Sequence, residues 1–584
     1  MSDNYWTKEP RSARAAGFGM KLPARAVTRR RFLSSVAVAT GAGVMIACGG
    51  SDEKATTPAG APQGAATQAV SGTQAAAQAT PGPKGGNITT ATVGTDAKSF
   101  HVYQTTDSVS ANYQGLVYGG GSLTKRDPES LQNVGHAAEK WTVSDDKKTY
   151  TFTLKDIKWS DGTPMTTADY VWTFEQASKP ENKYPRLISL QEIATYKALD
   201  AKTLQVTLKD ALVIGLETAD YITPLPKHVW EKYDWNDPVK NPEILNPTVV
   251  NGMWKLKEWK RDASATFVRN ELYFDGPPLL DSTTYRIFGT SALAYQALKA
   301  GEIDYLGITP ADVKEAKTLS SLNVHPYFSA TGGYNYVGFN MRRPWAKDVR
   351  VRQAVSFATD RKGIIDAVAY GEGRPVYANY TESSWVFNPN VEKYTFDPKK
   401  SADLLKQAGY TLQGKQLMKD GQQLKMKILF NQGNAVREGI STVLQQQLAD
   451  LGIAAEVIPM EFQAYLELIK KEPFDYDLFV LGWTASIDPH WSIQIWNEKG
   501  IPDLNSGGYI NKQVEALYDQ GAREFETEKR KQIYGQIQKH LSDDPPYVFV
   551  YEGRVNFGAN KKLGGIVPTR IGVLYNQNQW FLNK

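Results

Sequence analysis

The chain has 584 residues, of which 41% are hydrophobic and 11% aromatic, so it is long enough to bury one or more sizeable cores. Its formal net charge is +5, but residues 1–31 carry eight lysines or arginines and two acids, a net charge of +6. The remaining chain is therefore close to neutral, at about −1, which argues against a nucleic-acid partner.

A signal peptide is predicted over residues 1–47. The apolar stretch at residues 32–47 is too short and too rich in glycine and alanine for a membrane-spanning helix. Just before it, residues 28–34 have the sequence TRRRFLS, which fits the twin-arginine export pattern. An export receptor recognises the two guanidinium groups of this pattern. We therefore expect Arg29 and Arg30 to direct export.

Cys48 is the only cysteine of the chain and directly follows the residues MIA. Small residues before a cysteine at the end of a signal peptide resemble a lipobox, in which the thiol receives a diacylglycerol. A buried structural thiol is the alternative. Lipidation would place the protein outside the cytoplasm, anchored to the outer face of the cell membrane in the periplasm or at the cell surface.

Residues 48–84 are predicted to form a disordered tether. They consist largely of Ala, Gly, Thr, Gln and Pro, and no aromatic residue occurs between Phe32 and Phe100. Such a composition buries too little surface to offset the conformational entropy of an ordered chain. A flexible coil of about 35 residues would span roughly 30–35 Å, enough to hold a folded body off a membrane.

Two strands and a helix are predicted early in the folded part. Residues 150–155 (YTFTLK) and 204–209 (LQVTLK) alternate apolar and polar side chains, as half-buried strands do. Between them, Asp161-Gly162 marks a turn, and Thr166 and Asp169 have the spacing of a capping box at the start of a helix.

The later part of the chain reads as α/β. Asp397-Pro398 begins a predicted helix that ends before Gly409, with a capping acid, a first-turn proline and a terminal glycine. Apolar residues then predict a strand at 424–430, a helix at 440–451 and a strand at 453–459. This strand-helix-strand order favours a parallel pair of strands.

The motifs of the common hydrolases and nucleotide-binding proteins are missing or incomplete. No Gly-x-Ser-x-Gly occurs, residues 144–147 have a Ser-x-x-Lys spacing without a later Lys-Thr-Gly, and residues 409–415 lack the Ser or Thr that completes a phosphate loop. The histidines have no metal-binding i, i+4 spacing; they are His101, His136, His228, His325, His490 and His540. We expect no catalytic residue, metal or cofactor, and the absence of repeats argues against a structural cell-wall protein.

Several segments resemble family 5 solute-binding proteins, the peptide- and nickel-binding components of ABC importers. They keep the family's order along the chain and are residues 137–146 (AAEKWTVSDD), 159–164 (WSDGTP), 251–256 (NGMWKL), 348–354 (DVRVRQA), 482–489 (GWTASIDP) and 507–511 (GGYIN). The resemblance covers the chain from about residue 86 to its end.

This resemblance implies an α/β fold of the periplasmic-binding-protein type, with two lobes, mixed sheets and a hinge near Tyr336 and Pro545-Pro546. The implied segments are 85–130, 222–325 and 545–584 for domain I, 131–221 for an inserted β-rich domain II, and 326–544 for domain III. Binding proteins of this build close on their ligand through contacts that exist only in the closed form.

The resemblance also implies a function without chemistry. A monomer would capture a small solute, most simply a peptide-like one, and deliver it to the permease subunits of an ABC transporter. The alternatives are a non-peptide solute, such as an oligosaccharide or a metal chelate, and a family member used as a sensor or chaperone.

In the resembling peptide binders, a Gly-Trp segment leads into the cleft, and an acid shortly after it pairs with the peptide's amine. Here Trp483 would form the cleft wall, with a core position as its alternative. Ser486 stands where the acid would be, so we expect that a free α-amine is not the main anchor. Asp488 is a further candidate contact, or else it fixes the turn before Pro489.

The same matching implies further ligand-binding residues. Thr106 and Asp107 would lie in a ligand-facing loop of domain I, and Arg437 would bind a carboxylate, with a solvated helix-surface charge as its alternative. The remaining candidates, two beside the hinge and one near the pocket, are Tyr334, Tyr336 and Trp385.

Overall fold

A computed structural model of the chain describes residues 82–583. The signal peptide, Arg29, Arg30, Cys48 and nearly all of the predicted tether lie outside these described residues. Within them, no helix combines the length and the apolar character that a membrane crossing requires.

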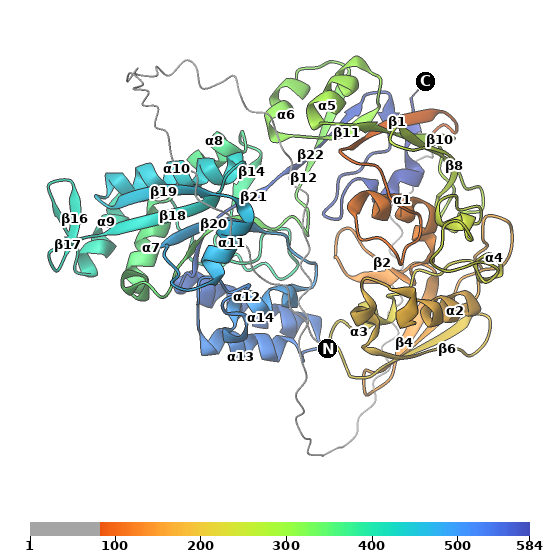
Figure 1. Ribbon diagram of the computed structural model, residues 1–584, viewed down its shortest axis with the longest axis horizontal. Helices are drawn as coiled ribbons and strands as arrows, with labels where there is room; N and C mark the ends of the chain where they lie inside the picture. Colours follow the sequence, from red (N-terminus) through yellow and green to blue (C-terminus); the bar gives the residue numbers. More distant parts are fainter. Residues whose placement is uncertain (1–81, 584) are drawn as a thin grey trace, which may run out of the picture. The chain divides into compact units, whose positions relative to one another are not determined.

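The first sheet is mixed and has seven strands in the order β12-β22-β11-β1-β10-β9-β8 (Figure 1). Strand β1 lies parallel to β10 and β11, and the other pairs are antiparallel. The strands are β1 (Asn87–Val93), β8 (Trp254–Lys260), β9 (Ser264–Arg269), β10 (Ser282–Phe288), β11 (Tyr305–Ile308), β12 (Leu322–Tyr327) and β22 (Val555–Asn560). The helices that accompany them are α1 (Ser108–Tyr118), α5 (Ser291–Ala300) and α6 (Pro310–Ala316).

The second sheet is antiparallel, with the order β4-β5-β7-β6. Its strands are β4 (Ala138–Val143), β5 (Thr149–Leu154), β6 (Ile193–Ala198) and β7 (Thr203–Leu208). The two predicted strands are confirmed as β5 and β7, in which every second residue is buried. The predicted helix is confirmed as α2 (Thr167–Ala177), and Thr166 and Asp169 form its capping box.

The third sheet has six strands in the order β14-β21-β13-β20-β18-β19. They are β13 (Tyr334–Phe339), β14 (Gly373–Pro375), β18 (Lys425–Asn431), β19 (Ala454–Met460), β20 (Leu478–Trp483) and β21 (Tyr547–Gly553). The predicted strand-helix-strand unit is confirmed, because β18 and β19 pair in parallel and α10 (Ala435–Asp450) connects them. The predicted helix after Asp397 is α9 (Pro398–Gln407), which Asp397 caps.

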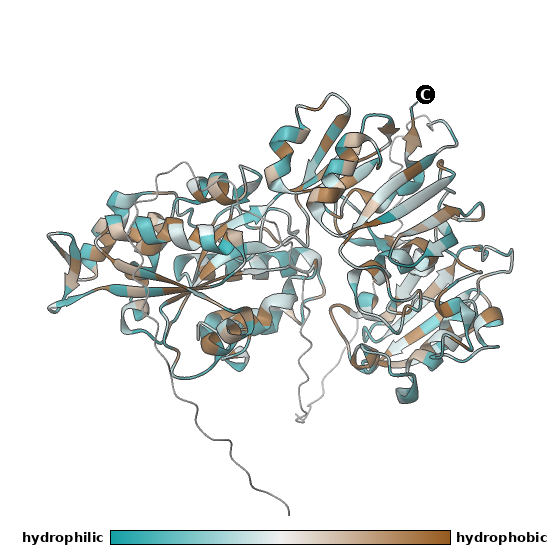
Figure 2. Cartoon of the chain, turned by 45° about the horizontal axis from the view of Figure 1, so that its top comes forward, coloured by the Kyte–Doolittle hydropathy of each residue, from teal (hydrophilic) through white to brown (hydrophobic). Residues whose placement is uncertain are grey.

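Helices cover both faces of the six-stranded sheet, because alternate residues of its strands enter two separate cores. One face packs on α7 (Val349–Ala358), α8 (Arg361–Val368), α9 and α10. The other packs on α11 (Phe462–Lys470), α12 (Ile493–Trp496), α13 (Lys512–Gly521) and α14 (Thr527–Asp543). Figure 2 shows brown, hydrophobic residues along these strands.

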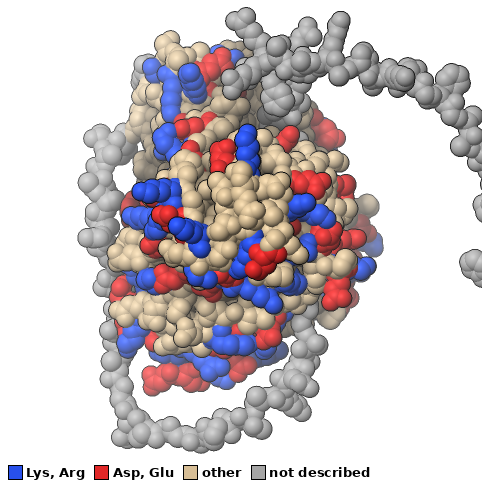
Figure 3. Space-filling view, turned by 90° about the vertical axis from the view of Figure 1, so that its left-hand side faces the viewer, with Lys and Arg blue, Asp and Glu red and all other residues tan. Residues whose placement is uncertain are grey.

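The remaining strands and α-helices are short. They are β2 (Thr124–Arg126), β3 (Asn133–Gly135), α3 (Gly215–Ala219), α4 (Lys227–Trp230), β15 (Thr411–Gln413), β16 (Gln416–Lys419), β17 (Gln422–Gln423), β23 (Leu563–Gly564) and β24 (Phe581–Leu582). On the face shown in Figure 3, basic and acidic side chains are interspersed, as expected for a folded part of nearly neutral charge.

The chain crosses between the seven-stranded and the six-stranded sheet twice. The first crossing is at residues 328–333, between β12 and β13, just before Tyr336. The second is at Arg554, between β21 and β22, and not at Pro545-Pro546 as expected. Strand β21 pairs with β13, so residues 547–553 lie in the sheet of the expected domain III rather than that of domain I. The division into three domains otherwise stays a prediction.

Candidate functional site

Three of the residues singled out in the sequence line one cavity of about 220 Å³. They are Tyr334, Arg437 and Trp483, and Asn335, Thr484 and several glycines complete the lining. We call this the hinge cavity, because Gly332 and Gly333 of the first crossing segment belong to it. Tyr334 and Trp483 are paired residues of the adjacent strands β13 and β20, so the sheet register places them side by side.

An aromatic stack supports the wall of the hinge cavity. The half-buried indole of Trp483 stacks on the ring of Tyr336, with centroids 6.0 Å apart and an interplanar angle of 11°. Tyr336 stacks in turn on Tyr547 at 4.0 Å. Tyr336 is only 1% exposed and does not line the cavity, so it acts as a rigid backing for Trp483.

The hydroxyl group of Tyr334 is buried and has no hydrogen-bond partner among residues 82–583. Burial raises the pKa of Tyr334 well above its usual value, so this group stays a neutral O–H. A buried polar group without a partner costs free energy, which a ligand or water atom placed beside it would recover.

Arg437 places a positive charge at the hinge cavity. It lies in the first turn of α10, and its Nη1 donates to Asn431 Oδ1 at 2.5 Å. Its guanidinium group lies 5.9 Å from the ring centroid of Phe462, and burial lowers its pKa. No acidic side chain in the described part of the chain forms an ion pair with it. Arg437 is therefore a half-buried cation that lacks a counterion, and not a solvated surface charge.

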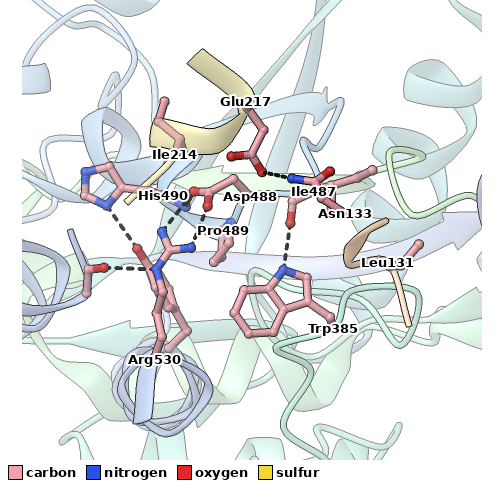
Figure 4. A network of polar contacts seen from close by, with 12 residues as sticks. Leu131, Asn133, Ile214, Glu217, Trp385, Ile487, Asp488, Pro489, His490 and Arg530 are labelled. Carbon is pink, nitrogen blue, oxygen red and sulfur yellow. Dashed lines mark hydrogen bonds and ion pairs between the residues drawn. The ribbon is translucent and has the colours of Figure 1, made fainter. Parts of the chain in front are cut away.

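Trp385 and Asp488 line a second cavity of about 200 Å³, which we call the paired-charge cavity (Figure 4). One side is formed by residues between 126 and 217, and the other by residues between 385 and 530. The first side contributes Arg126, Asn133 and Glu217, none of which was singled out in the sequence.

The side chain of Asp488 stabilises the loop in which it lies. This agrees with the structural role that was expected as the alternative to ligand contact. Its Oδ1 accepts from the backbone N–H of His490 at 2.8 Å, capping the turn that follows. Both of its oxygens also accept from Arg530 on α14, at 2.5 and 3.1 Å. Trp385 donates its indole N–H to the carbonyl of Ile487 at 2.9 Å. The loop that carries the candidate contacts is therefore anchored to α14 and to Trp385.

Ser486 lies in the same loop and is exposed, with no hydrogen bond to any residue in the range 82–583. Thr106 is exposed as well. Asp107 caps α1 by accepting from Ser110 N at 2.8 Å, while its Oδ2 is buried without a hydrogen-bond partner among the described residues. These three residues line neither the hinge cavity nor the paired-charge cavity.

The residues that sequence reasoning missed are held by long-range ion pairs. Arg126 Nη2 lies 2.5 Å from Glu217 Oε1, which also accepts from Asn133 Nδ2 at 3.1 Å. Arg530 lies 42 positions after Asp488 and is only 7% exposed in its side chain. No motif or spacing marks these residues, because each partner comes from a separate segment of the chain.

The family profile described as bacterial extracellular solute-binding proteins, family 5, middle region, matches residues 132–501. The oligopeptide-binding protein AppA of Bacillus subtilis is 28% identical over 513 residues, which cover 86% of this chain and 92% of that protein. Its solved structure, in complex with a nonapeptide, covers 86% of this chain and 100% of that one, with a TM-score of 0.62 and 27% identity. The ABC transporter substrate-binding protein CtaP of Listeria monocytogenes matches over 86% of this chain and 100% of that one, with a TM-score of 0.72 and 25% identity.

Proposed function

The chain belongs to the bacterial extracellular solute-binding proteins of family 5, and from this premise we propose that it captures a peptide-like solute and delivers it to an ABC transporter. It binds its solute without converting it. The two cavities with their aromatic walls, Trp483 in one and Trp385 in the other, are the proposed place of capture.

The observation that carries the peptide assignment is the position of Arg437. A half-buried guanidinium group without a carboxylate partner faces the hinge cavity beside Trp483. Arginine recognises carboxylates with parallel hydrogen bonds, and such charge-assisted bonds are stronger than neutral ones. A peptide supplies the missing carboxylate at its C-terminus, and the apolar parts of its side chains fit the aromatic wall.

Capture would work by closure of the two lobes about the crossings at residues 328–333 and Arg554. The paired-charge cavity is lined by residues between 126 and 217 and by residues between 385 and 530. A solute bound there contacts both groups of residues, so its contacts depend on how closely these groups approach each other. A ligand that interacts better with the closed form shifts the population toward it. Delivery then requires only that the permease recognise the closed form.

We place the protein outside the cytoplasm. The twin-arginine pattern at Arg29 and Arg30 would direct export, and a lipid on Cys48 would anchor the body through the tether. A diacylglycerol provides two acyl chains, which anchor a protein stably where one chain is marginal.

Native mass spectrometry of the purified, unstripped protein tests the ligand class, because a bound solute adds its own mass. We expect a peptide mass that dissociates without chemical change. Calorimetry with that peptide and small-angle scattering with and without it then test capture and closure, with saturable binding and a smaller radius of gyration as the expected results. A sugar or metal-chelate mass, or any product formed from the solute, would refute the proposal.

A further inference from the structure

The paired-charge cavity contains ionised side chains of both signs in equal number. On one side, Arg126 pairs with Glu217 at 2.5 Å. On the other, Arg530 holds Asp488 with two hydrogen bonds, at 2.5 and 3.1 Å. Figure 4 shows Glu217 with Asn133 on one side and Asp488 with Arg530 on the other. Each charge that lines the cavity therefore has its counterion within the protein.

Adding another ion to this cavity would be unfavourable. The side chains of Arg530 and Asp488 are only 7% and 20% exposed, so their attraction is little screened by water. An ionised solute group would have to lose its hydration without gaining a free counterion, or break one of the existing pairs. Either route costs more than the burial of a neutral polar group.

The cavity does provide an unused hydrogen-bond acceptor. Glu217 uses its Oε1 for both Arg126 and Asn133, while its Oε2 has no partner among the residues that the structure describes. Apolar side chains, including Leu216, Ile487 and Phe525, line the cavity together with the uncharged polar side chains of Gln132 and Thr527. The cavity therefore suits a group that combines apolar atoms with an N–H or O–H donor.

We infer that the part of the solute that occupies the paired-charge cavity is uncharged and donates a hydrogen bond to Glu217, as a carboxamide or hydroxyl group does. This inference rests on the proposed function and narrows its substrate class. An ionised solute group would have no counterion in the cavity, which costs free energy. The cavity would therefore select a neutral group chiefly by rejecting acidic and basic groups.

Two variants with the same new side chain test this assignment. Glu217→Gln leaves Arg126 without its counterion, and Arg126→Gln leaves Glu217 without its own. The first change adds one positive charge to the cavity and the second removes one, while both introduce glutamine. If the balance of charges sets the selectivity, the two variants must shift it in opposite directions.

The experiment measures calorimetric affinities for peptides that differ at one position by Gln, Glu or Lys, with each position varied in turn. At the position that fills the cavity, the wild-type protein should bind the Gln form at least tenfold more tightly than the Glu and Lys forms. In Glu217→Gln, the loss of affinity when the peptide carries Glu instead of Gln should be smaller than in the wild type. In Arg126→Gln, the loss of affinity when the peptide carries Lys instead of Gln should be smaller. Equal affinities at every position, or shifts of the same sign in both variants, would overturn the inference.

A crystal structure of the protein with its co-purified solute separates this inference from the proposed function. If no peptide binds the wild-type protein, the proposal of peptide capture is wrong. The solute group that occupies the paired-charge cavity still shows whether this part of the solute is uncharged. An uncharged donor there supports the inference, and an ionised group contradicts it.

Discussion

The carboxylate of Asp488 and the guanidinium group of Arg530 form a two-pronged ion pair, with Oδ2 2.5 Å from Nη1 and Oδ1 3.1 Å from Nη2. Asp488 is the first carboxylate after the Gly-Trp segment in the sequence, so it was a candidate partner for the amine of a peptide. Its negative charge is already compensated by an arginine that is only 7% exposed. The amine of a ligand would have to compete with that arginine.

The first prediction concerns the amino terminus of the ligand. Ser486 cannot form an ion pair, and Asp488 already has one, so N-acetylation of a bound peptide should change its affinity less than tenfold. Calorimetric titrations with free and acetylated forms of the same peptide measure this difference. A loss of tenfold or more on acetylation, about 1.4 kcal/mol, would show that a carboxylate of the protein does anchor the amine.

The second prediction concerns the carboxyl terminus. Arg437→Gln should weaken the binding of a peptide with a free C-terminus by about 1.5–3 kcal/mol, because a charge-assisted hydrogen bond is lost. The same variant should bind the C-terminally amidated peptide as the wild type does. Arg523→Gln, at an exposed position outside both cavities, is the control and should change neither affinity. Equal losses for free and amidated peptides would contradict a carboxylate role.

The third prediction separates a ligand-contacting tryptophan from a structural one. Trp483 is half-buried at the hinge cavity, so Trp483→Ala should weaken ligand binding by about 2 kcal/mol or more, with a smaller effect on the unfolding of the ligand-free protein. Trp496 is fully buried against Tyr547, so Trp496→Ala should destabilise the ligand-free protein by about 3–5 kcal/mol. Denaturant unfolding and calorimetry measure the two effects. A Trp483→Ala protein that loses as much stability as Trp496→Ala would place Trp483 in the core.

The fourth prediction concerns the pH dependence of stability. His101 is fully buried, its Nε2 lies 2.9 Å from the carbonyl oxygen of Trp235, and its Nδ1 accepts from Tyr103 N at 3.2 Å. This geometry requires the neutral ring, and burial lowers the pKa of His101 from 6.5 to about 3.

Because the unfolded chain binds a proton at this histidine below pH 6.5 and the folded chain does not, stability should fall as the pH falls from 6.5 toward 3. The contribution of one such group is at most about 1.4 kcal/mol per pH unit. Denaturant unfolding of the wild type and His101→Asn between pH 7 and 5 measures it, and the variant should show the smaller slope. Identical slopes would mean that His101 is not the titrating group.

The fifth prediction concerns export and anchoring. Replacing Arg29 and Arg30 by lysine keeps the charge but removes the paired guanidinium groups, so the precursor should accumulate in the cytoplasm. Cys48→Ser should release the exported protein from membranes. Cell fractionation and immunoblotting measure both outcomes. Normal export of the lysine variant would rule out the twin-arginine route, and membrane retention of Cys48→Ser would rule out the lipid.

Local patterns in the sequence were sufficient for much of the secondary structure. The alternation in residues 150–155, the capping pair Thr166 and Asp169, and the strand-helix-strand order around α10 all appear in the fold where they were expected. Side-chain periodicity and capping depend on residues within one element, so they can be read from the chain without knowing its path. The family motifs extended this information to the binding class.

Only the tertiary structure determines which charged residues form ion pairs. Glu217 pairs with Arg126 across 91 positions and Arg530 with Asp488 across 42, and nothing in the local sequence marks these partners. The second crossing likewise falls at Arg554, because the pairing of β21 with β13 extends the six-stranded sheet beyond Pro545-Pro546. Ion pairs and strand partners depend on the path of the whole chain, and only its folding brings such distant residues into contact.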